Sequence, residues 1–225
     1  MNAFHRSDSL FFGGMSALFL VLVVAGFFPY FSAVAYGDIQ KPAVIHIHAA
    51  VSSLWILLFG TQVCLVGAQR TDWHRRLGLV GGVLVIALVV FGYLAAIHAA
   101  QRGYSSTGDD PLVFLSIPLK NIVVFALLVS VGLWFRNNPA THKRLMYLAT
   151  GAGLMMPPIS RLPPPVELVA LLVLMFAGPV YDKLRHGSVH RVYIWGIPFG
   201  IAATVIQSLI ASTGHWMRFA SWLTR

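Results

Sequence analysis

The chain has few charged residues and very few acidic ones. Only 10% of its 225 residues are Asp, Glu, Lys or Arg, and Asp and Glu together number seven. Soluble globular domains carry about 25% charged residues, so this composition excludes that class. Seven acidic residues are also too few for a carboxylate-bridged di-iron centre. The solvent for most of this chain is therefore lipid.

Cysteine occurs once, as Cys64 within an apolar stretch, so an intramolecular disulfide is excluded. The sequence also lacks several short catalytic motifs: a phosphate-cradling Gly loop, Gly-x-Ser-x-Gly, His-Glu-x-x-His and Cys-x-x-Cys-His. These absences remove the usual ATPase, hydrolase, zincin and c-type haem interpretations. They leave open whether the chain is an enzyme.

Apolar runs fill the chain from end to end, and 57% of its residues are hydrophobic. A bilayer core about 30 Å thick needs about 20 apolar residues per helix. We therefore expect an all-α integral membrane bundle of about seven transmembrane helices, forming one domain over 1–225. The Pro-rich stretch 155–165 should end the fifth helix near Met156, which makes the fifth and sixth spans short. The bundle would have one leading helix and three hairpins: 10–36, 43–69, 77–101, 111–135, 145–160, 168–181 and 192–217.

Basic residues predict the orientation of the bundle, because they collect in cytoplasmic loops. The formal net charge is +9. No basic run alternates with aromatic residues as nucleic-acid binding requires, so we expect lipid and not nucleic acid as the partner. An N-in, C-out arrangement places five basic residues outside, namely Lys41, Arg102, Arg161, Arg218 and Arg225. It places ten inside: Arg6, Arg70, Arg75, Arg76, Arg136, Lys143, Arg144, Lys183, Arg185 and Arg191.

Each of the three expected inner turns contains a His followed by a basic residue. These are His74, His142 and His190, and Asp182 lies close to the third turn in sequence. If the hairpins pack side by side, the three imidazoles lie at one depth. They are then able to hold a metal, a haem iron or a proton path. Anchoring to lipid phosphates at the cytoplasmic boundary explains the same pattern.

A second His group lies toward the expected outer face, with His46 and His48 on the second helix and His98 on the third. Residues two apart on a helix point about 200° apart, so His46 and His48 cannot both face one site. A haem held by two His residues needs one from each of two helices at matched depth. His48 with His98 meets this requirement and is one pair among several.

Several polar residues fall inside the expected spans. Lys120 and Asn121 stand about ten residues into the fourth helix, where a charge needs a cavity or a partner. Alternatively, Lys120 extends outward along its own stem. Gln62 and Gln207 are uncharged, and such residues more often join helices by hydrogen bonds than bind substrates.

The motifs resemble those of a known group of membrane proteins. They include His46-x-His48, Trp55, Gln62, His74-Arg75-Arg76-Leu77-Gly78, His142-Lys143-Arg144-Leu145-Met146 and Tyr181-Asp182. The chain resembles uncharacterised bacterial multi-span proteins of the DUF2306 type over roughly residues 40–195. This resemblance implies a bacterial inner-membrane protein and assigns no reaction.

A looser similarity is to the cytochrome b561 type, in which His residues on neighbouring helices hold two b haems. Here His74 lies at the inner turn, at the opposite depth from His46 and His48, so one haem could not bridge them.

Three functions remain open from the sequence. The leading hypothesis is a haem- or metal-associated electron-transfer protein of a bacterial inner membrane, with haem b on paired His residues and a quinone or another membrane redox partner. It is motivated by nine His residues among so few other ionisable groups. The second is a transporter or small-molecule binding protein with a polar intramembrane cavity. The third is a non-catalytic assembly or scaffold subunit.

Overall fold

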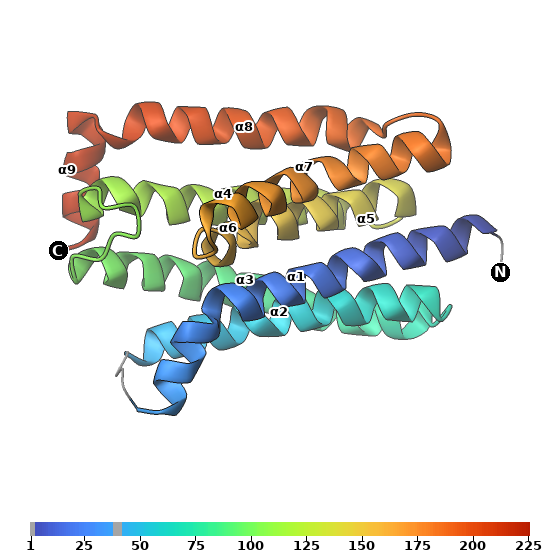
Figure 1. The fold of residues 1–225 in the computed structure, drawn as a ribbon, viewed down its shortest axis with the longest axis horizontal. Coiled ribbons are helices and arrows are strands. Elements are labelled where there is room, and N and C mark those ends of the chain that lie inside the picture. Colours follow the sequence, from blue (N-terminus) through green and yellow to red (C-terminus); the bar gives the residue numbers. More distant parts are fainter. Residues whose placement is uncertain (1–2, 38–41) are drawn as a thin grey trace. The chain divides into compact units, whose positions relative to one another are not determined.

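The computed structural model describes residues 3–37 and 42–225, and within them every regular element is a helix. Lys41, one of the basic residues expected outside, falls beyond the described residues. Figure 1 shows the helices in chain order. Their bounds are α1 Ala3–Ala35, α2 Ala43–Gly67, α3 Thr71–Gln101, α4 Pro111–Trp134, α5 Pro139–Leu148, the π-helix η1 Ala149–Leu154, α6 Met156–Ile159, α7 Pro164–His186, α8 Arg191–Ala211 and α9 Gly214–Leu223.

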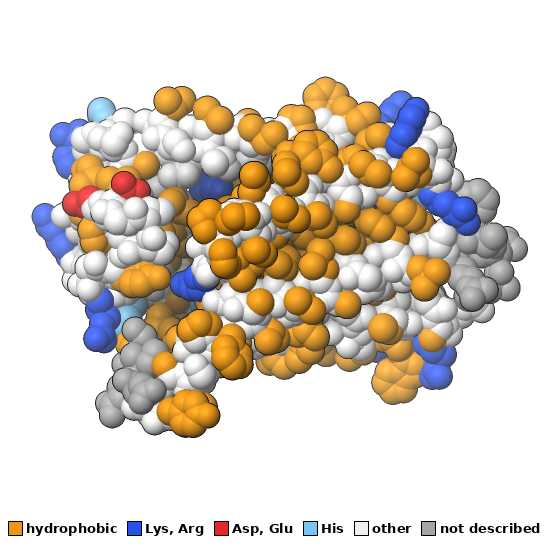
Figure 2. Space-filling model, viewed as in Figure 1, with side chains coloured by type: hydrophobic (Ala, Val, Ile, Leu, Met, Phe, Trp, Pro, Cys, Tyr) orange, Lys and Arg blue, Asp and Glu red, His pale blue; other side chains and the backbone are white. Residues whose placement is uncertain are grey.

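Six helices of the described part are long and apolar enough to cross a membrane: α1, α2, α3, α4, α7 and α8. Figure 2 shows hydrophobic side chains over much of the visible face, and most of the Lys and Arg side chains lie toward its left and right edges. Trp134 at the end of α4 is 82% exposed, as expected for an aromatic residue at a membrane interface. The protein is thus an all-helical, multi-pass membrane bundle.

The structure differs from the expected spans at the fifth and the last. The expected fifth span is divided into α5, η1 and the one-turn helix α6. Pro157 and Pro158 lie in the first turn of α6, where a missing backbone N–H breaks no helical bond. The last expected span ends at Ala211, and the chain turns at Thr213 into the separate helix α9.

The helices pack into two compact units. Unit 1 comprises Met1–Leu88 and Met155–Ser188, and unit 2 comprises Val89–Leu154 and Val189–Arg225. The chain therefore passes between the units within α3, between η1 and α6, and between α7 and α8.

In unit 1, α1 packs along α2 and against α6. The rings of Phe19 and Phe59 lie 5.6 Å apart between α1 and α2. Gly26 of α1 lies directly on the backbone of Pro158, leaving no room for a Cβ atom. In Figure 1, α1 bends in its second half. Pro29 lies in this region and removes one helical hydrogen bond there.

In unit 2, α4 packs against α5, η1, α8 and α9. Gly153 of η1 faces Phe125 of α4, and a Cβ on this glycine would lie 2.6 Å from the Phe125 Cβ. The rings of Tyr147 and Tyr193 join α5 to α8 at 6.3 Å. The π-helix η1 thus lies where its backbone closely approaches α4. Turns of this type are frequent at functional sites.

Helix α9 lies across the start of α4, to which it is fixed by Trp216. The Trp216 Nε1–H donates to the Leu112 carbonyl at 2.7 Å.

Replacing Trp216 with Phe removes this hydrogen bond but keeps most of the ring packing. We expect a loss of about 1 kcal/mol in the free energy of unfolding, measured by denaturation in detergent. The matched variant Trp222→Phe, at a side chain 65% exposed, should be neutral. Equal losses in both variants would show that the hydrogen bond contributes nothing.

Each unit brings its predicted inner turns together at one end. In unit 1, Ser9 at the start of α1 packs on Gly67 at the end of α2, and Asp8 meets Tyr181 near the end of α7. In unit 2, the end of α4 meets α5 through Gly132 and His142. Which end faces the cytoplasm stays a prediction.

Candidate functional site

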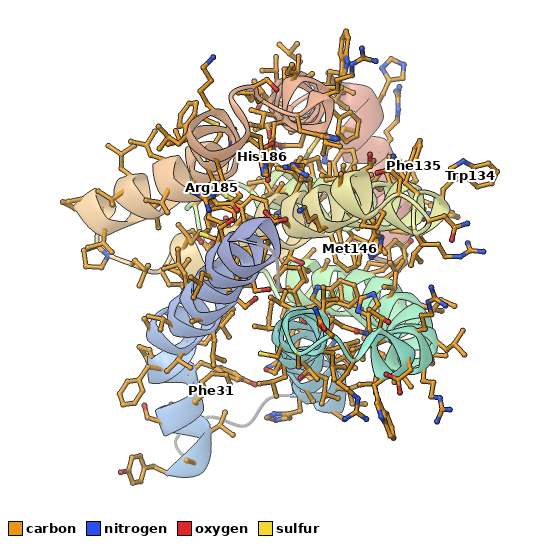
Figure 3. The ribbon with its side chains drawn as sticks, turned by 90° about the vertical axis from the view of Figure 1, so that its right-hand side faces the viewer. Phe31, Trp134, Phe135, Met146, Arg185 and His186 are labelled. Atoms are coloured by element: carbon orange, nitrogen blue, oxygen red, sulfur yellow. The ribbon has the colours of Figure 1, made fainter. Side chains whose placement is uncertain are left out.

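Two carboxylates and an imidazole meet at one end of unit 1. The His186 Nε2 atom lies 4.0 Å from Oδ1 of Asp182, one turn earlier on α7, and 3.7 Å from Oδ1 of Asp8 on α1. Figure 3 labels His186 and Arg185 at this end of α7. Asp182 is 1% exposed, and it is the one buried acidic side chain among the described residues. An acidic group buried in a span-capable helix marks a functional site by default.

Tyr181 completes this group, which we call the inner site: Asp8, Tyr181, Asp182 and His186. The Tyr181 hydroxyl donates to Oδ1 of Asp8 at 2.7 Å and lies 3.3 Å from the Ser7 hydroxyl. Its ring stacks on Phe11 with centroids 4.2 Å apart. This hydrogen bond fixes the Asp8 carboxylate beside His186.

The exposure of the inner site falls from its rim to its interior. The side chains of His186 and Asp8 are 26% and 23% exposed, whereas that of Asp182 is 1% exposed. Both distances from His186 exceed a direct hydrogen bond, so one water molecule or a small rotation would complete each link. Imidazole gains and loses a proton near neutral pH, and a carboxylate accepts one. The arrangement is therefore suited to passing protons between solvent and a buried carboxylate.

Sequence reasoning identified Asp182 but missed Asp8 and His186. The spacing of Asp182 and His186 is i, i+4, which places both on one helix face, and this signal was available. Asp8 gave no such signal. Its proximity to α7 depends on how the first and the seventh helices pack, across more than 170 residues of sequence.

The expected inner His group is divided between the two units, with His74 and Asp182 in unit 1 and His142 and His190 in unit 2. His142 Nδ1 lies 2.7 Å from the Gly132 carbonyl, so Nδ1 donates and Nε2 is left as the acceptor. At His190, Nδ1 instead accepts from the Val192 N–H at 3.2 Å and caps α8. A neutral His190 then carries its proton on Nε2. His142 thus has the form that a metal ligand needs, and His190 does not.

The outer His residues have different surroundings, as their spacing requires. His46 is exposed, and its Nδ1 lies 3.4 Å from the Tyr30 hydroxyl. His48 Nδ1 is buried, as is His98 Nε2, and neither has a hydrogen-bond partner in the described part of the chain. His48 belongs to unit 1 and His98 to unit 2.

The polar residues of the fourth and eighth helices join these helices inside unit 2. Lys120 Nζ donates to the Thr204 hydroxyl at 3.3 Å, and Gln207 Nε2 donates to the Ser116 hydroxyl at 2.7 Å. Asn121 is 5% exposed, and its Oδ1 finds no hydrogen-bond partner among the described residues. Lys120 and Gln207 thus act as interhelical contacts in this structure. The buried Oδ1 of Asn121 is left to be satisfied by water or a ligand.

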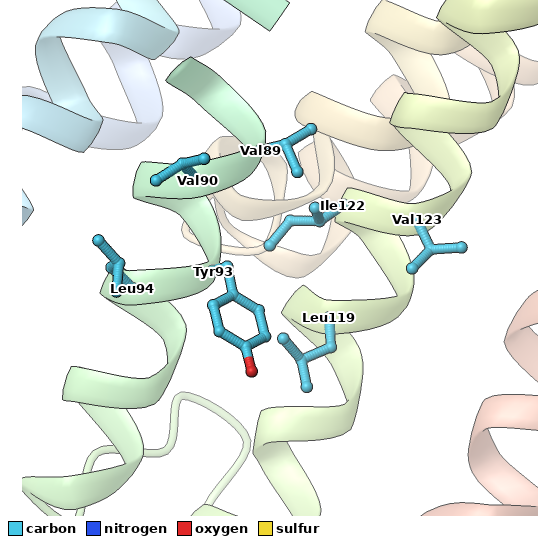
Figure 4. A pocket seen from close by; sticks show the side chains of 7 residues that line it. All are labelled: Val89, Val90, Tyr93, Leu94, Leu119, Ile122 and Val123. Carbon is cyan, nitrogen blue, oxygen red and sulfur yellow. The ribbon is translucent and has the colours of Figure 1, made fainter. Parts of the chain in front are cut away.

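An open groove of about 450 Å³ lies between α3 and α4 in unit 2, and Figure 4 shows its lining. Tyr93 and Leu94 line it from α3, and Leu119 and Val123 from α4. Its seven lining residues are all apolar apart from the Tyr93 hydroxyl, and Lys120, Asn121 and Gln207 are not among them. This groove is suited to a lipid chain and is distinct from the polar cavity expected for a transporter.

Comparisons with protein-family models, with curated proteins and with solved structures found no match to this chain. Over residues 3–37 and 42–225, no three His, Cys, Asp or Glu side chains are grouped to hold a metal ion. The function is therefore inferred from the arrangement of the chain's own residues.

Proposed function

We propose that this protein passes protons in the membrane through the inner site of unit 1, as the proton-handling part of a proton-coupled transport process. The observation that carries the proposal is the buried carboxylate of Asp182, 4.0 Å from His186 Nε2, with Asp8 3.7 Å from the same nitrogen. Intramembrane carboxylate and His residues serve as proton relays in pumps and transporters. The resemblance of its motifs to those of bacterial multi-span proteins supports the inner membrane of a bacterium as the proposed location.

The steps follow from the exposure of each group. His186, at the rim, takes a proton from solvent at a position 3.7 Å from Asp8 and 4.0 Å from Asp182. A water molecule or a ring rotation then brings the proton to Asp182 and neutralises the buried charge. Asp8, held in place by the Tyr181 hydroxyl, is the second carboxylate beside His186 on this path.

The proposal is tested with the purified full-length protein in liposomes that contain a pH-sensitive dye. An imposed pH gradient, with valinomycin and potassium to balance charge, should dissipate faster than in liposomes without protein. Equal rates in both preparations would contradict the proposal.

A second candidate function is electron transfer through haem b, with a quinone as the membrane redox partner. Two buried ring nitrogens favour it, His48 Nδ1 and His98 Nε2. Neither has a hydrogen-bond partner in the described part of the chain. A nitrogen that binds haem iron must likewise have its lone pair available. When bound, a haem would supply one-electron chemistry.

An absorption spectrum of the purified protein tests this candidate. A Soret band that is weakened by His48→Ala or His98→Ala, and unchanged by His215→Ala, would support haem binding. A preparation without a Soret band and without iron would end it.

A further inference from the structure

One side of α3 is uncovered along the half of the helix that belongs to unit 1. Five exposed residues follow one another there at intervals of one, three, four and three: Arg75, Arg76, Leu79, Val83 and Ile86. This spacing places all five on one side of the helix. We call this set the α3 strip. Its three apolar side chains, from Leu79 to Ile86, are 77%, 70% and 66% exposed.

Contacts of the neighbouring glycines show which way the α3 strip faces. A Cβ at Gly81 would lie 3.2 Å from Cδ2 of Leu58, so this side of α3 packs on α2. Gly81 is two residues from Val83 and points about 200° away from it. A Cβ at Gly82 would meet no heavy atom within 4 Å in the described part of the chain. The α3 strip therefore faces away from α2 and is open to lipid.

The first two residues of the α3 strip carry positive charges that the protein does not neutralise. Arg70, just before the helix, lies 3.7 Å from the carboxylate of Asp72. Among the described residues, neither Arg75 nor Arg76 has a carboxylate within ion-pair distance. The Arg76 guanidinium instead lies 5.5 Å from the centre of the Trp73 ring, and Trp73 is 44% exposed. An exposed Trp at the end of a span is typical of the headgroup level of a membrane.

We infer that the α3 strip binds an acidic phospholipid, with its phosphate at Arg75 and Arg76 and one acyl chain along the apolar part of the strip. Guanidinium groups bind phosphate oxygens through charged, often paired hydrogen bonds. Arg76 and Ile86 are ten residues apart, about 15 Å along the helix axis, which is half of a bilayer core about 30 Å thick. The strip thus matches one leaflet, with its charges at headgroup depth and its apolar side chains at acyl-chain depth.

Charge and shape favour an acidic lipid over the other carriers of a phosphate. A zwitterionic headgroup holds its own cation beside the phosphate, and the two guanidinium groups repel this cation. Inorganic phosphate would meet the two Arg side chains but would leave the apolar part of the strip without a ligand. The lipid site does not depend on proton movement through the inner site, because the two are built from different residues.

Trp73 reports on lipid at this site through its fluorescence. The full-length protein is placed in phosphatidylcholine vesicles that contain a lipid with a nitroxide near the top of one acyl chain, supplied as phosphatidylglycerol or as phosphatidylcholine. The Trp73 signal is the difference between the protein and its Trp73→Phe variant. Each Arg near a membrane surface favours acidic lipid about fivefold, so labelled phosphatidylglycerol should bind at least about tenfold more strongly. Equal quenching by the two labelled lipids would overturn the inference.

Variants of the two Arg residues separate this site from the general charge of the protein. Arg75→Gln combined with Arg76→Gln should abolish the preference for phosphatidylglycerol. The matched control combines Arg102→Gln with Arg218→Gln, which removes two exposed charges beyond the other end of α3 and in α9. This control should keep the preference, and an equal loss in it would overturn the site.

Two further measurements complete the test. Should the double variant fail to fold, the single variants decide: Arg75→Gln and Arg76→Gln should each lower the preference about fivefold, and no change in either would overturn the inference. Inorganic phosphate should not reduce the quenching more than chloride does at equal ionic strength. Displacement of the labelled lipid by phosphate alone would show a site for a free anion and would contradict the assignment to a lipid.

Discussion

Replacing Asp182 with Asn should nearly abolish proton movement. Asparagine has almost the same shape as aspartate, so packing at this buried position is kept, but the amide cannot accept and release a proton. Positioned acid–base groups contribute about a hundredfold or more to the rate of proton transfer, and we expect a loss of that size. The measurement is the rate of pH change inside liposomes containing Asp182→Asn, compared with the unaltered protein.

Asp72→Asn is the matched control for this prediction. Asp72 is also acidic and lies in a predicted inner turn, but its side chain is 58% exposed and 3.7 Å from the equally exposed Arg70. Exposed ion pairs contribute little, so this variant should keep the full rate. A loss of similar size in Asp72→Asn would mean that general surface charge, and not the inner site, controls the rate.

Replacing Gly26 with Ala should cause a large loss of stability. A Cβ atom at Gly26 would lie 2.7 Å from both Cα and C of Pro158, and closer still to the Pro158 carbonyl oxygen. These are backbone atoms, which cannot rotate away as a side chain can. Helices α1 and α6 must therefore move apart, and overpacking of this kind costs about 3 kcal/mol. Thermal unfolding in detergent measures the effect.

Gly13→Ala provides the comparison within the same helix. A Cβ at Gly13 meets no heavy atom within 4 Å, so no contact has to shift. Alanine also favours the helix over glycine by up to about 1 kcal/mol. The expected result is therefore an unchanged or raised melting temperature. If both glycine variants unfold at the same temperature, the close approach of α1 and α6 does not contribute to stability.

The membrane-spanning architecture was predictable because hydropathy over about 20 residues reports directly on helices that cross a bilayer. Helix ends were less predictable. The sequence prediction ends each span at a charged residue, so the sixth span stops at residue 181. In the structure, α7 continues through Lys183 and Arg185. Long basic side chains reach the interface from within a helix, so a charge does not end it.

The site was only partly predictable, because it depends on contacts between distant segments. Asp182 stood out from the sequence as an acidic residue beside apolar stretches, but the contact of α7 with Asp8 has no local signal. Arg144 was expected as an anchor at the membrane surface, yet it is 4% exposed and donates to the Ala140 carbonyl at 2.8 Å. The sequence pattern alone does not distinguish a buried basic residue in a turn from an exposed one.

Infrared difference spectroscopy between two pH values tests most directly whether Asp182 takes up a proton inside unit 1. If Asp182 is protonated, a carbonyl band of a protonated carboxylic acid should grow on acidification of the reconstituted protein. This band should be missing in Asp182→Asn and retained in Asp72→Asn. A spectrum without such a band, or a band of equal size in Asp182→Asn, would show that Asp182 does not take up the proton.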